Sequence, residues 1–234
     1  KNDEDYLILQ QELREQDQKQ FQLIRELLRA RLESWFESLL HFEAKRADNV
    51  EATAAFLQAE FDYLQFNWQI DDLWLLTNDG QPIHVTHDHV PEFVRQDFNS
   101  VVSSQSSVAN IRCIEKCQQL ISMPVLSNNG EMLVLSFSSS LLDMMAALNR
   151  STFADLAIVN IENTAMLKEV NILPPISLAN RNLIRTLLQQ VPNHVSTKSV
   201  VQKGYQLDAE NTTYLINLLP IDEHLGRAIY MIFI

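Results

Sequence analysis

Three closely spaced histidines have the residue types and the spacing of a metal site. His84, His87 and His89 form the pattern H-x-x-H-x-H, with Asp88 between the last two. Imidazole and carboxylate groups suit zinc, copper or nickel. The spacing fits a loop, because a helix would place His84 and His87 on one face without His89. A solvated polar loop is the alternative, and a pH-sensing role is also open because histidine titrates near neutrality.

Cys113 and Cys117 are the only cysteines of the chain. On one straight strand, residues four positions apart are separated by about 13 Å, whereas a disulfide needs Cα atoms within about 7 Å. The pair can close if residues 114–116 form a tight turn, and an oxidising compartment would favour closure. We expect a disulfide, and two reduced thiols packed in the sheet are the alternative.

The sequence offers no catalytic constellation. It lacks the nucleophile motif G-x-S-x-G, the zinc motif H-E-x-x-H and a plausible pair of catalytic carboxylates. The serine-rich runs 103–107 and 136–140 have no partnered histidine, and only four glycines are available for a phosphate-binding loop. We therefore expect no enzyme activity and no cofactor.

The composition is that of a globular protein with an acidic surface. Of its 234 residues, 46% are hydrophobic and 21% are charged, which supplies enough apolar material for a core. The formal net charge of -12 repels DNA, RNA and anionic lipid, so we expect no nucleic-acid partner.

Neither a membrane span nor a signal peptide is visible in the sequence. No apolar run approaches the roughly 18–20 residues that cross a bilayer. Since the chain opens at Lys1 and stops at Ile234 inside an apolar run, we expect both ends to be boundaries within a longer protein.

The first part of the chain contains no helix breaker, because its first glycine is Gly80 and its first proline is Pro82. Apolar residues recur there at spacings of three and four, which predicts a long helix over residues 4–44 and a second over 48–65. A helix of roughly 40 residues rises about 60 Å. That length exceeds what one small domain needs, so we expect part of the helix to pack against another chain.

Two apolar rows are predicted on the long helix. The first is Phe21, Ile24, Leu28, Trp35, Leu39 and Phe42, and the second is Leu27, Leu32, Phe36 and Leu40. A helix that rests on one sheet needs a single row. We therefore expect one row to meet its twin across a two-fold axis and form a homodimer. The alternative is a frayed start, with Leu7, Leu9 and Leu13 exposed singly.

After Trp68, short apolar runs alternate with turns, and the order of elements then repeats. The first series predicts strands at 73–77, 82–85, 111–115, 119–126 and 132–137, and helices at 92–102 and 141–148. The second predicts strands at 153–161, 195–201, 213–221 and 228–234, and a helix at 178–190. Aligning Pro124 with Pro220 also aligns Gly130 with Gly226, which indicates an internal duplication. The alternative is that any two apolar hairpins can be matched in this way.

A long N-terminal helix followed by two such units resembles the double Cache sensor domain of bacterial histidine kinases, diguanylate cyclases and chemoreceptors. The resemblance rests on the segments 72–80, 123–126 with Gly130, and 153–159. It implies an α+β fold with two PAS-like units whose sheets are mostly antiparallel. It also implies a helical stalk (1–65), a membrane-distal unit (66–141) and a membrane-proximal unit (142–234).

The same resemblance implies a periplasmic location and a membrane anchor, with one transmembrane helix before Lys1 and another after Ile234. It further implies a small-molecule ligand, held in many relatives by the distal unit. The amino-acid-binding branch carries a Tyr/Arg/Trp/Tyr/Asp signature, which the corresponding segment 93–98 lacks.

We expect the ligand pocket between the distal sheet and the segment 91–103. The candidate lining residues are Trp68, Trp74, Phe93, Arg95, Phe98 and Ser122. Arg95 could clamp a carboxylate or could be a solvated helix residue. The aromatic residues could instead belong to the core.

The sequence thus predicts a non-catalytic sensor module of a membrane receptor, with a histidine kinase favoured over a diguanylate cyclase or chemoreceptor as the output. Ligand binding would shift how the long helices pack in a dimer. The rival interpretations are a coiled-coil adaptor that binds a partner protein, and a hydrolase whose active site the sequence does not reveal. A deep apolar pocket would favour the sensor, and a flat face with a large exposed patch the adaptor.

Overall fold

The computed structural model describes residues 2–44, 50–86, 89–113, 116–127, 130–161, 166–174, 176–209, 211–222 and 229–234. The chain packs as two compact units. The first unit comprises Leu27–Arg112 and Gln118–Ser140, and the second comprises Lys1–Glu26, Cys113–Cys117 and Leu141–Ile234. The sequence-based boundaries 1–65, 66–141 and 142–234 stay a prediction.

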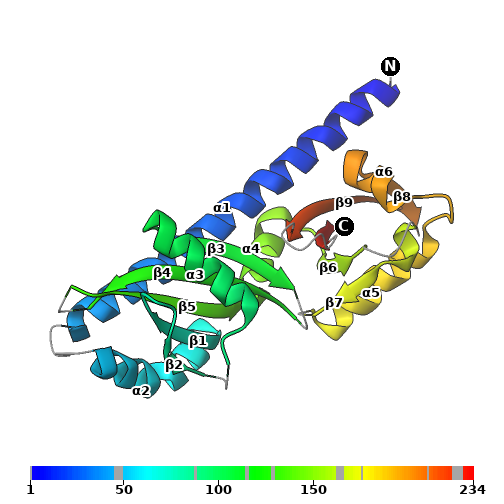
Figure 1. The fold of residues 1–234 in the computed structure, drawn as a ribbon. Helices are drawn as coiled ribbons and strands as arrows, with labels where there is room; N and C mark the ends of the chain where they lie inside the picture. Colours follow the sequence, from blue (N-terminus) through cyan, green and yellow to red (C-terminus); the bar gives the residue numbers. More distant parts are fainter. Residues whose placement is uncertain are drawn as a thin grey trace. The chain divides into compact units, whose positions relative to one another are not determined.

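Two helices form residues 2–44 and 50–68, within the stretch that precedes the first glycine and proline, as predicted (Figure 1). Helix α1 (Asn2–Ala44) belongs to the second unit up to Glu26 and to the first unit from Leu27 onward. Helix α2 (Val50–Trp68) belongs to the first unit. Residues with high helix propensity such as Gln, Glu, Leu and Arg dominate α1, so an unbroken helix of this length is locally favoured.

The predicted division of α1 into two apolar rows was wrong in part. Leu32 and Phe36, assigned to the second row, lie in the core of the first unit, whereas Leu27 is 60% exposed. Five residues turn a helix by about 140° beyond a full revolution, so Leu27 and Leu32 cannot share a face. Leu27 instead continues an exposed row with Leu9, Leu13 and Leu23. The side chains of Leu39, Leu40 and Phe42 lie outside the described residues.

The first unit is built on a five-stranded antiparallel sheet with the order β2-β1-β5-β4-β3. Its strands are β1 (Ile70–Thr77), β2 (Pro82–Val85), β3 (Val108–Cys113), β4 (Cys117–Leu126) and β5 (Met132–Ser140). One face packs against Leu32 and Phe36 of α1 and Leu57 and Leu64 of α2. Helix α3 (Glu92–Ser104) covers the opposite face, which we call the α3 face.

The second unit repeats this plan with a sheet of order β7-β6-β10-β9-β8. Its strands are β6 (Leu156–Asn160), β7 (Asn171–Leu173), β8 (Tyr205–Ala209), β9 (Thr212–Asp222) and β10 (Ile229–Phe233). Its helices are α4 (Leu142–Thr152), α5 (Leu178–Gln190), α6 (Thr197–Lys203) and the short 3-10 helix η1 (Leu167–Glu169). Ile184 and Leu187 of α5 pack on the sheet in an aliphatic core.

The two sheets have the same strand order and the same register at equivalent positions. Pro124 pairs with Val134 in the first sheet, and Pro220 pairs with Tyr230 in the second. The equivalence proposed from the sequence therefore holds in three dimensions, and the predicted pair of similar α/β units is confirmed. On the same basis, the segment 72–76 of β1 corresponds to 155–159 at β6.

One predicted strand of the second unit is a helix. Residues 195–201 were expected to be a strand because of their valines, but Thr197–Lys203 forms α6. The hydroxyl of Ser196 accepts a hydrogen bond from the backbone N–H of Ser199 and caps the helix. The edge position in the sheet is taken instead by β8, whose alternating Tyr205, Leu207 and Ala209 were overlooked.

Polar contacts hold the first part of α1 on the second unit. Asn217 of β9 is buried and donates a hydrogen bond to Asp17 at 3.3 Å, and Arg14 donates to the backbone carbonyl of Gln202. Burial raises the pKa of the Asp17 carboxyl, and the bond from Asn217 offsets this only in part. The ionised carboxylate therefore carries a desolvation cost, which is relieved as the pH falls through the raised pKa.

Gly204 ends α6 with φ 68° and ψ -178°, a region almost restricted to glycine. A Cβ at this position would lie 2.7 Å from Oδ1 of the buried Asn217. We expect Gly204→Ala to reduce the free energy of unfolding by more than the roughly 1–3 kcal/mol of backbone strain alone. Gly130→Ala is the control, because φ is 81° there but no described atom lies within 4 Å of the added Cβ. Equal losses in urea unfolding of the two variants would contradict the clash.

Candidate ligand-binding site

A row of buried polar side chains crosses the α3 face of the first sheet. Trp74 on β1 is the cross-strand partner of Ser136 on β5, which in turn is the partner of Ser122 on β4. The two serine hydroxyls lie 2.7 Å apart and share a hydrogen bond, and neither residue is exposed. We call Trp74, Ser136 and Ser122 the polar row.

Trp74 is the largest member of the polar row and is 2% exposed. Its ring meets that of Phe93 edge-to-face, with centroids 6.3 Å apart. Its indole Nε1 is buried and finds no hydrogen-bond acceptor among the described residues. A buried indole N–H normally has a partner, so this donor is available to a bound molecule.

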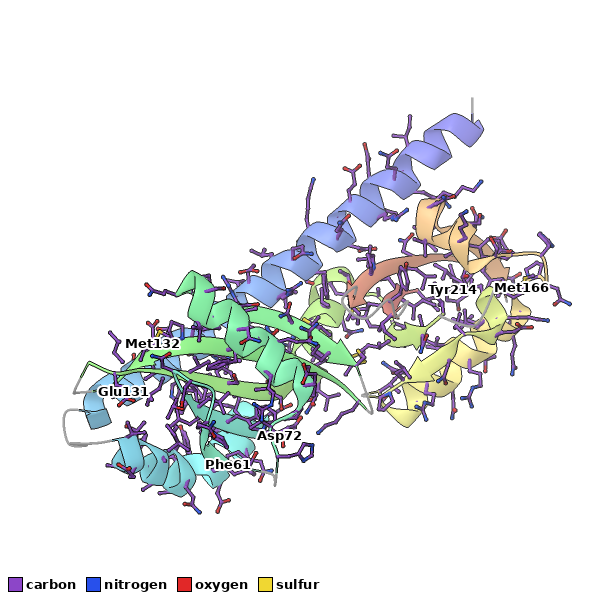
Figure 2. The ribbon with its side chains drawn as sticks, in the orientation of Figure 1. Phe61, Asp72, Glu131, Met132, Met166 and Tyr214 are labelled. Atoms are coloured by element: carbon purple, nitrogen blue, oxygen red, sulfur yellow. A yellow bond between two sulfur atoms is a disulfide. The ribbon has the colours of Figure 1, made fainter. Side chains whose placement is uncertain are left out.

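A second set of polar groups lies next to the row. Asp72, labelled in Figure 2, is two residues from Trp74 on β1 and accepts a hydrogen bond of 3.1 Å from Ser138. The side-chain amide of Gln118 donates to Asp71 at 2.7 Å and to Ser138 at 3.4 Å. Carboxylate, hydroxyl and amide groups are therefore linked across β1, β5 and β4.

A buried ion pair ties α3 to β3. Arg112 Nη2 donates to Asp97 Oδ1 at 3.1 Å, and Asn110 Nδ2 donates to the same oxygen at 2.9 Å. Asp97 is 2% and Arg112 6% exposed, so both charges are withdrawn from water. Such a pair is costly to bury, but removing one partner is worse because it leaves the other charge uncompensated.

The second unit has apolar residues at the positions that correspond to the polar row. The residues equivalent to Trp74, Ser136 and Ser122 are Ala157, Ile232 and Leu218, which occupy the same cross-strand positions. All three are buried in the aliphatic core of the second unit. The shared framework is thus stable with apolar residues at these positions, and the polar row is a property of the first unit alone.

The structure brings four of the six predicted site residues together and separates the other two. Trp74, Phe93, Phe98 and Ser122 lie on the α3 face. Trp68 instead packs on the opposite side of the sheet, where its ring lies 5.0 Å from that of Trp35 and under the guanidinium of Arg31. The side chain of Arg95 is exposed on α3.

Several residues of the site were missed from the sequence, among them Ser136, Asp97 and Arg112. Ser136 could have been found from the internal repeat, because the same alignment sets it against Ile232. Asp97 and Arg112 could not, since nothing local shows that a helix residue and a strand residue 15 positions later form an ion pair.

The predicted metal site falls largely outside the described residues. His87, Asp88 and the side chain of His84 are not described, and His89 is exposed. Within the described ranges, no group of three histidine, cysteine, aspartate or glutamate side chains could hold a metal ion. The histidine site stays a prediction.

Cys113 and Cys117 form a disulfide in the structure, with their Cα atoms 4.0 Å apart. The bond closes the connection between β3 and β4. The separation lies within the limit of about 7 Å that a disulfide requires.

The second unit has a polar surface groove between α1 and α6. Its volume is about 460 Å³, and its lining residues are Gln10, Gln11, Arg14, Glu15, Gln18, Gln202 and Lys203. The groove contains none of the predicted site residues.

A family model described as the double sensory domain of two-component sensor kinases matches residues 9–234. The chain belongs to this double Cache family. No curated protein matches it. None of the helices described for this double Cache domain is long and apolar enough to cross a membrane.

The chain is similar to several solved structures at low sequence identity. The extracellular domain of a protein described as a histidine kinase, vpHK1S-Z8, is 8% identical with a TM-score of 0.53, over 99% of this chain and 93% of that chain. The amino acid chemoreceptor PctB of Pseudomonas aeruginosa PAO1, in complex with L-Arg, is 13% identical with a TM-score of 0.46, over 95% and 94%. The chemoreceptor Tlp3 of Campylobacter jejuni, in complex with 4-methylisoleucine, is 11% identical with a TM-score of 0.46, over 96% and 91%.

The Asp97–Arg112 pair predicts non-additive stability effects. We expect Arg112→Met or Asp97→Asn alone to cost about 3–5 kcal/mol, because each leaves a buried polar partner uncompensated. The double variant should cost clearly less than the sum of the two. Urea unfolding of the three variants measures the coupling, and strictly additive losses would show that the pair does not act as a unit.

Proposed function

We propose that this double Cache domain is the extracytoplasmic sensor of a membrane-anchored receptor, and that its ligand binds at the α3 face of the first unit. The polar row carries this proposal. Trp74, Ser136 and Ser122 are buried where the second unit has Ala157, Ile232 and Leu218 on the same framework. Burying polar groups is costly unless they are fully bonded, and a ligand that bonds to them accounts for their presence.

We favour a sensor histidine kinase as the parent protein, since the family description names two-component sensor kinases. A diguanylate cyclase or chemoreceptor output is compatible with the same module. In each case the output lies in a part of the receptor other than this domain. We propose that membrane helices flank the domain and anchor it on the periplasmic side.

We further propose that the signal travels through a homodimer of α1. The residues Leu9, Leu13, Gln16, Gln20, Leu23 and Leu27 follow alternating steps of four and three, the spacing of a coiled-coil seam. Leu9, Leu13, Leu23 and Leu27 are between 39% and 60% exposed, whereas Phe21, Leu32 and Phe36 are buried. One face of α1 is thus occupied by its own chain, and a neighbouring face offers apolar residues to a second copy.

Cross-linking of the receptor in membranes tests the seam. Single cysteines at positions 9, 13, 16, 20, 23 and 27 should form disulfides between copies, because these positions face the partner helix. Cysteines at Gln11, Glu15, Gln18 and Gln22 are the controls, since these residues are exposed on the opposite side of α1. Uniform cross-linking of both sets, or none in either, would rule out this seam.

Filling the polar row should abolish ligand binding while preserving the fold. Ser136→Ile introduces the residue of the second unit, at an expected cost of about 1–3 kcal/mol from overpacking. Ser139→Ile is the control, because Ser139 is also buried but is three residues further along β5 and therefore faces the other side.

Thermal-shift screening of the folded domain against metabolite and metal libraries measures the response. A ligand at about 100 times its dissociation constant should stabilise the wild type by about 2.7 kcal/mol. We expect Ser136→Ile to lose that stabilisation and Ser139→Ile to retain it. Retention by both variants would place the ligand elsewhere, and a wild type without any ligand would favour the adaptor interpretation.

A further inference from the structure

The chemistry of the polar row restricts the class of ligand, if the proposed function holds. The Trp74 indole offers one N–H donor without an acceptor in the described part of the chain. Ser122 and Ser136 together carry two hydroxyl hydrogens, of which one is used in the bond between them. Each serine oxygen can also accept a hydrogen bond, whereas the indole N–H can only donate, so the ligand group that meets Trp74 is a hydrogen-bond acceptor.

The surroundings of these donors are apolar. Trp74 packs in one cluster with Leu76, Leu120 and Val134 of the sheet and with Val94 and Phe98 of α3. The part of the ligand that meets these side chains would therefore be hydrocarbon, whereas the polar groups beside the row, Asp72, Ser138 and Gln118, already bond to one another.

The charges on the α3 face disfavour an anion at this position. The nearest charged group along β1 is the carboxylate of Asp72, two residues from Trp74. Arg112, a buried cation on β3, is separated from β1 by β5 and β4; its Nη2 pairs with Asp97, whereas its Nε and Nη1 have no hydrogen-bond partner among the described residues. On α3, Glu92 and Arg95 are exposed to solvent. A carboxylate buried beside Trp74 would meet a like charge without a cation of its own.

We propose that the ligand of this sensor is an uncharged, largely apolar carbonyl compound, such as a ketone, lactone or primary amide, whose oxygen accepts a hydrogen bond from Trp74. The inference deepens the proposed function and depends on it. A free amino acid whose carboxylate took the place of this oxygen would bury that charge beside Asp72.

Binding at the row requires the α3 face to open. Trp74, Ser122 and Ser136 are at most 2% exposed, and Phe98 of α3 is 9% exposed. The Phe98 ring also packs on the turn between β1 and β2, where a Cβ added to Gly80 would lie 3.3 Å from it. A ligand that reaches Trp74 must displace side chains of α3 that cover it, such as Phe93, whose ring contacts that of Trp74. Such a displacement would supply the difference between the free and bound states that a sensor needs.

The indole N–H signals of the domain test the proposal directly. Three tryptophans give three signals in a ¹H–¹⁵N correlation spectrum, and Trp35→Phe and Trp68→Phe assign that of Trp74 by elimination even if Trp74→Phe does not fold. The probes are 2-pentanone, δ-valerolactone and pentanamide, with pentanoate and L-norvaline as charged analogues of the same chain length. The corresponding eight-carbon series covers a larger site.

We expect at least one uncharged carbonyl compound to shift the Trp74 indole proton downfield in a saturable way, with the Trp35 and Trp68 signals unchanged. The charged analogues should leave it in place, and Ser136→Ile should remove the effect. A Trp74 shift with only pentanoate, L-norvaline or their eight-carbon analogues would overturn the ligand class and leave the proposed site intact.

Two other outcomes would contradict more than the ligand class. If the Trp74 signal is already downfield in the free domain and no probe moves it, the indole N–H bonds to an ordered water only. The inference would then be wrong. Shifts confined to Trp35 or Trp68 would overturn the proposed site as well, because Trp68 lies on the opposite side of the sheet.

Discussion

Burial of both faces of each sheet is the constraint on which the rest of this structure depends. In β1, Leu73 and Leu75 face the α1 and α2 side, whereas Trp74 and Leu76 face α3. A strand covered on both faces becomes a continuous apolar run instead of an alternating one. Every polar side chain inside such a sandwich needs a bonding partner, because water does not reach it. This is why three polar residues in one row carry functional meaning.

Because the chain contains two copies of the same unit, the residues buried at equivalent positions of the two sheets can be compared within one molecule. The two sheets share strand order and register, so each position of the first unit has an equivalent in the second. Where the polar row crosses the first sheet, the second is filled by Ala157, Ile232 and Leu218. The second unit therefore shows which residues can fill each position of the sheet. Where the first unit has a different kind of residue at an equivalent position, the fold itself does not require that residue.

Long-range polar contacts set how the helices are attached to these sheets. The Asp97–Arg112 pair links α3 to β3 in the first unit, and the Asp17–Asn217 bond links α1 to β9 in the second. Both involve buried or half-buried groups, whose bonds are directional. A helix held by apolar contacts alone can slide over its sheet, whereas these bonds define discrete positions. Discrete positions are what a two-state signal requires.

The sequence by itself determined the features that arise from local forces. The stretch without glycine or proline before Gly80 predicted α1 and α2, and the spacing from Pro124 to Gly130 predicted the hairpin that recurs after Pro220. Only the tertiary structure decided that residues 197–203 form a helix, because the capping bond of Ser196 and the competing strand β8 outweigh the β propensity of the valines. It also decided that Trp68 and Trp74 lie on opposite faces, and that Asp97 meets Arg112. These outcomes depend on neighbours that are distant in the sequence, and local periodicity carries no information about them.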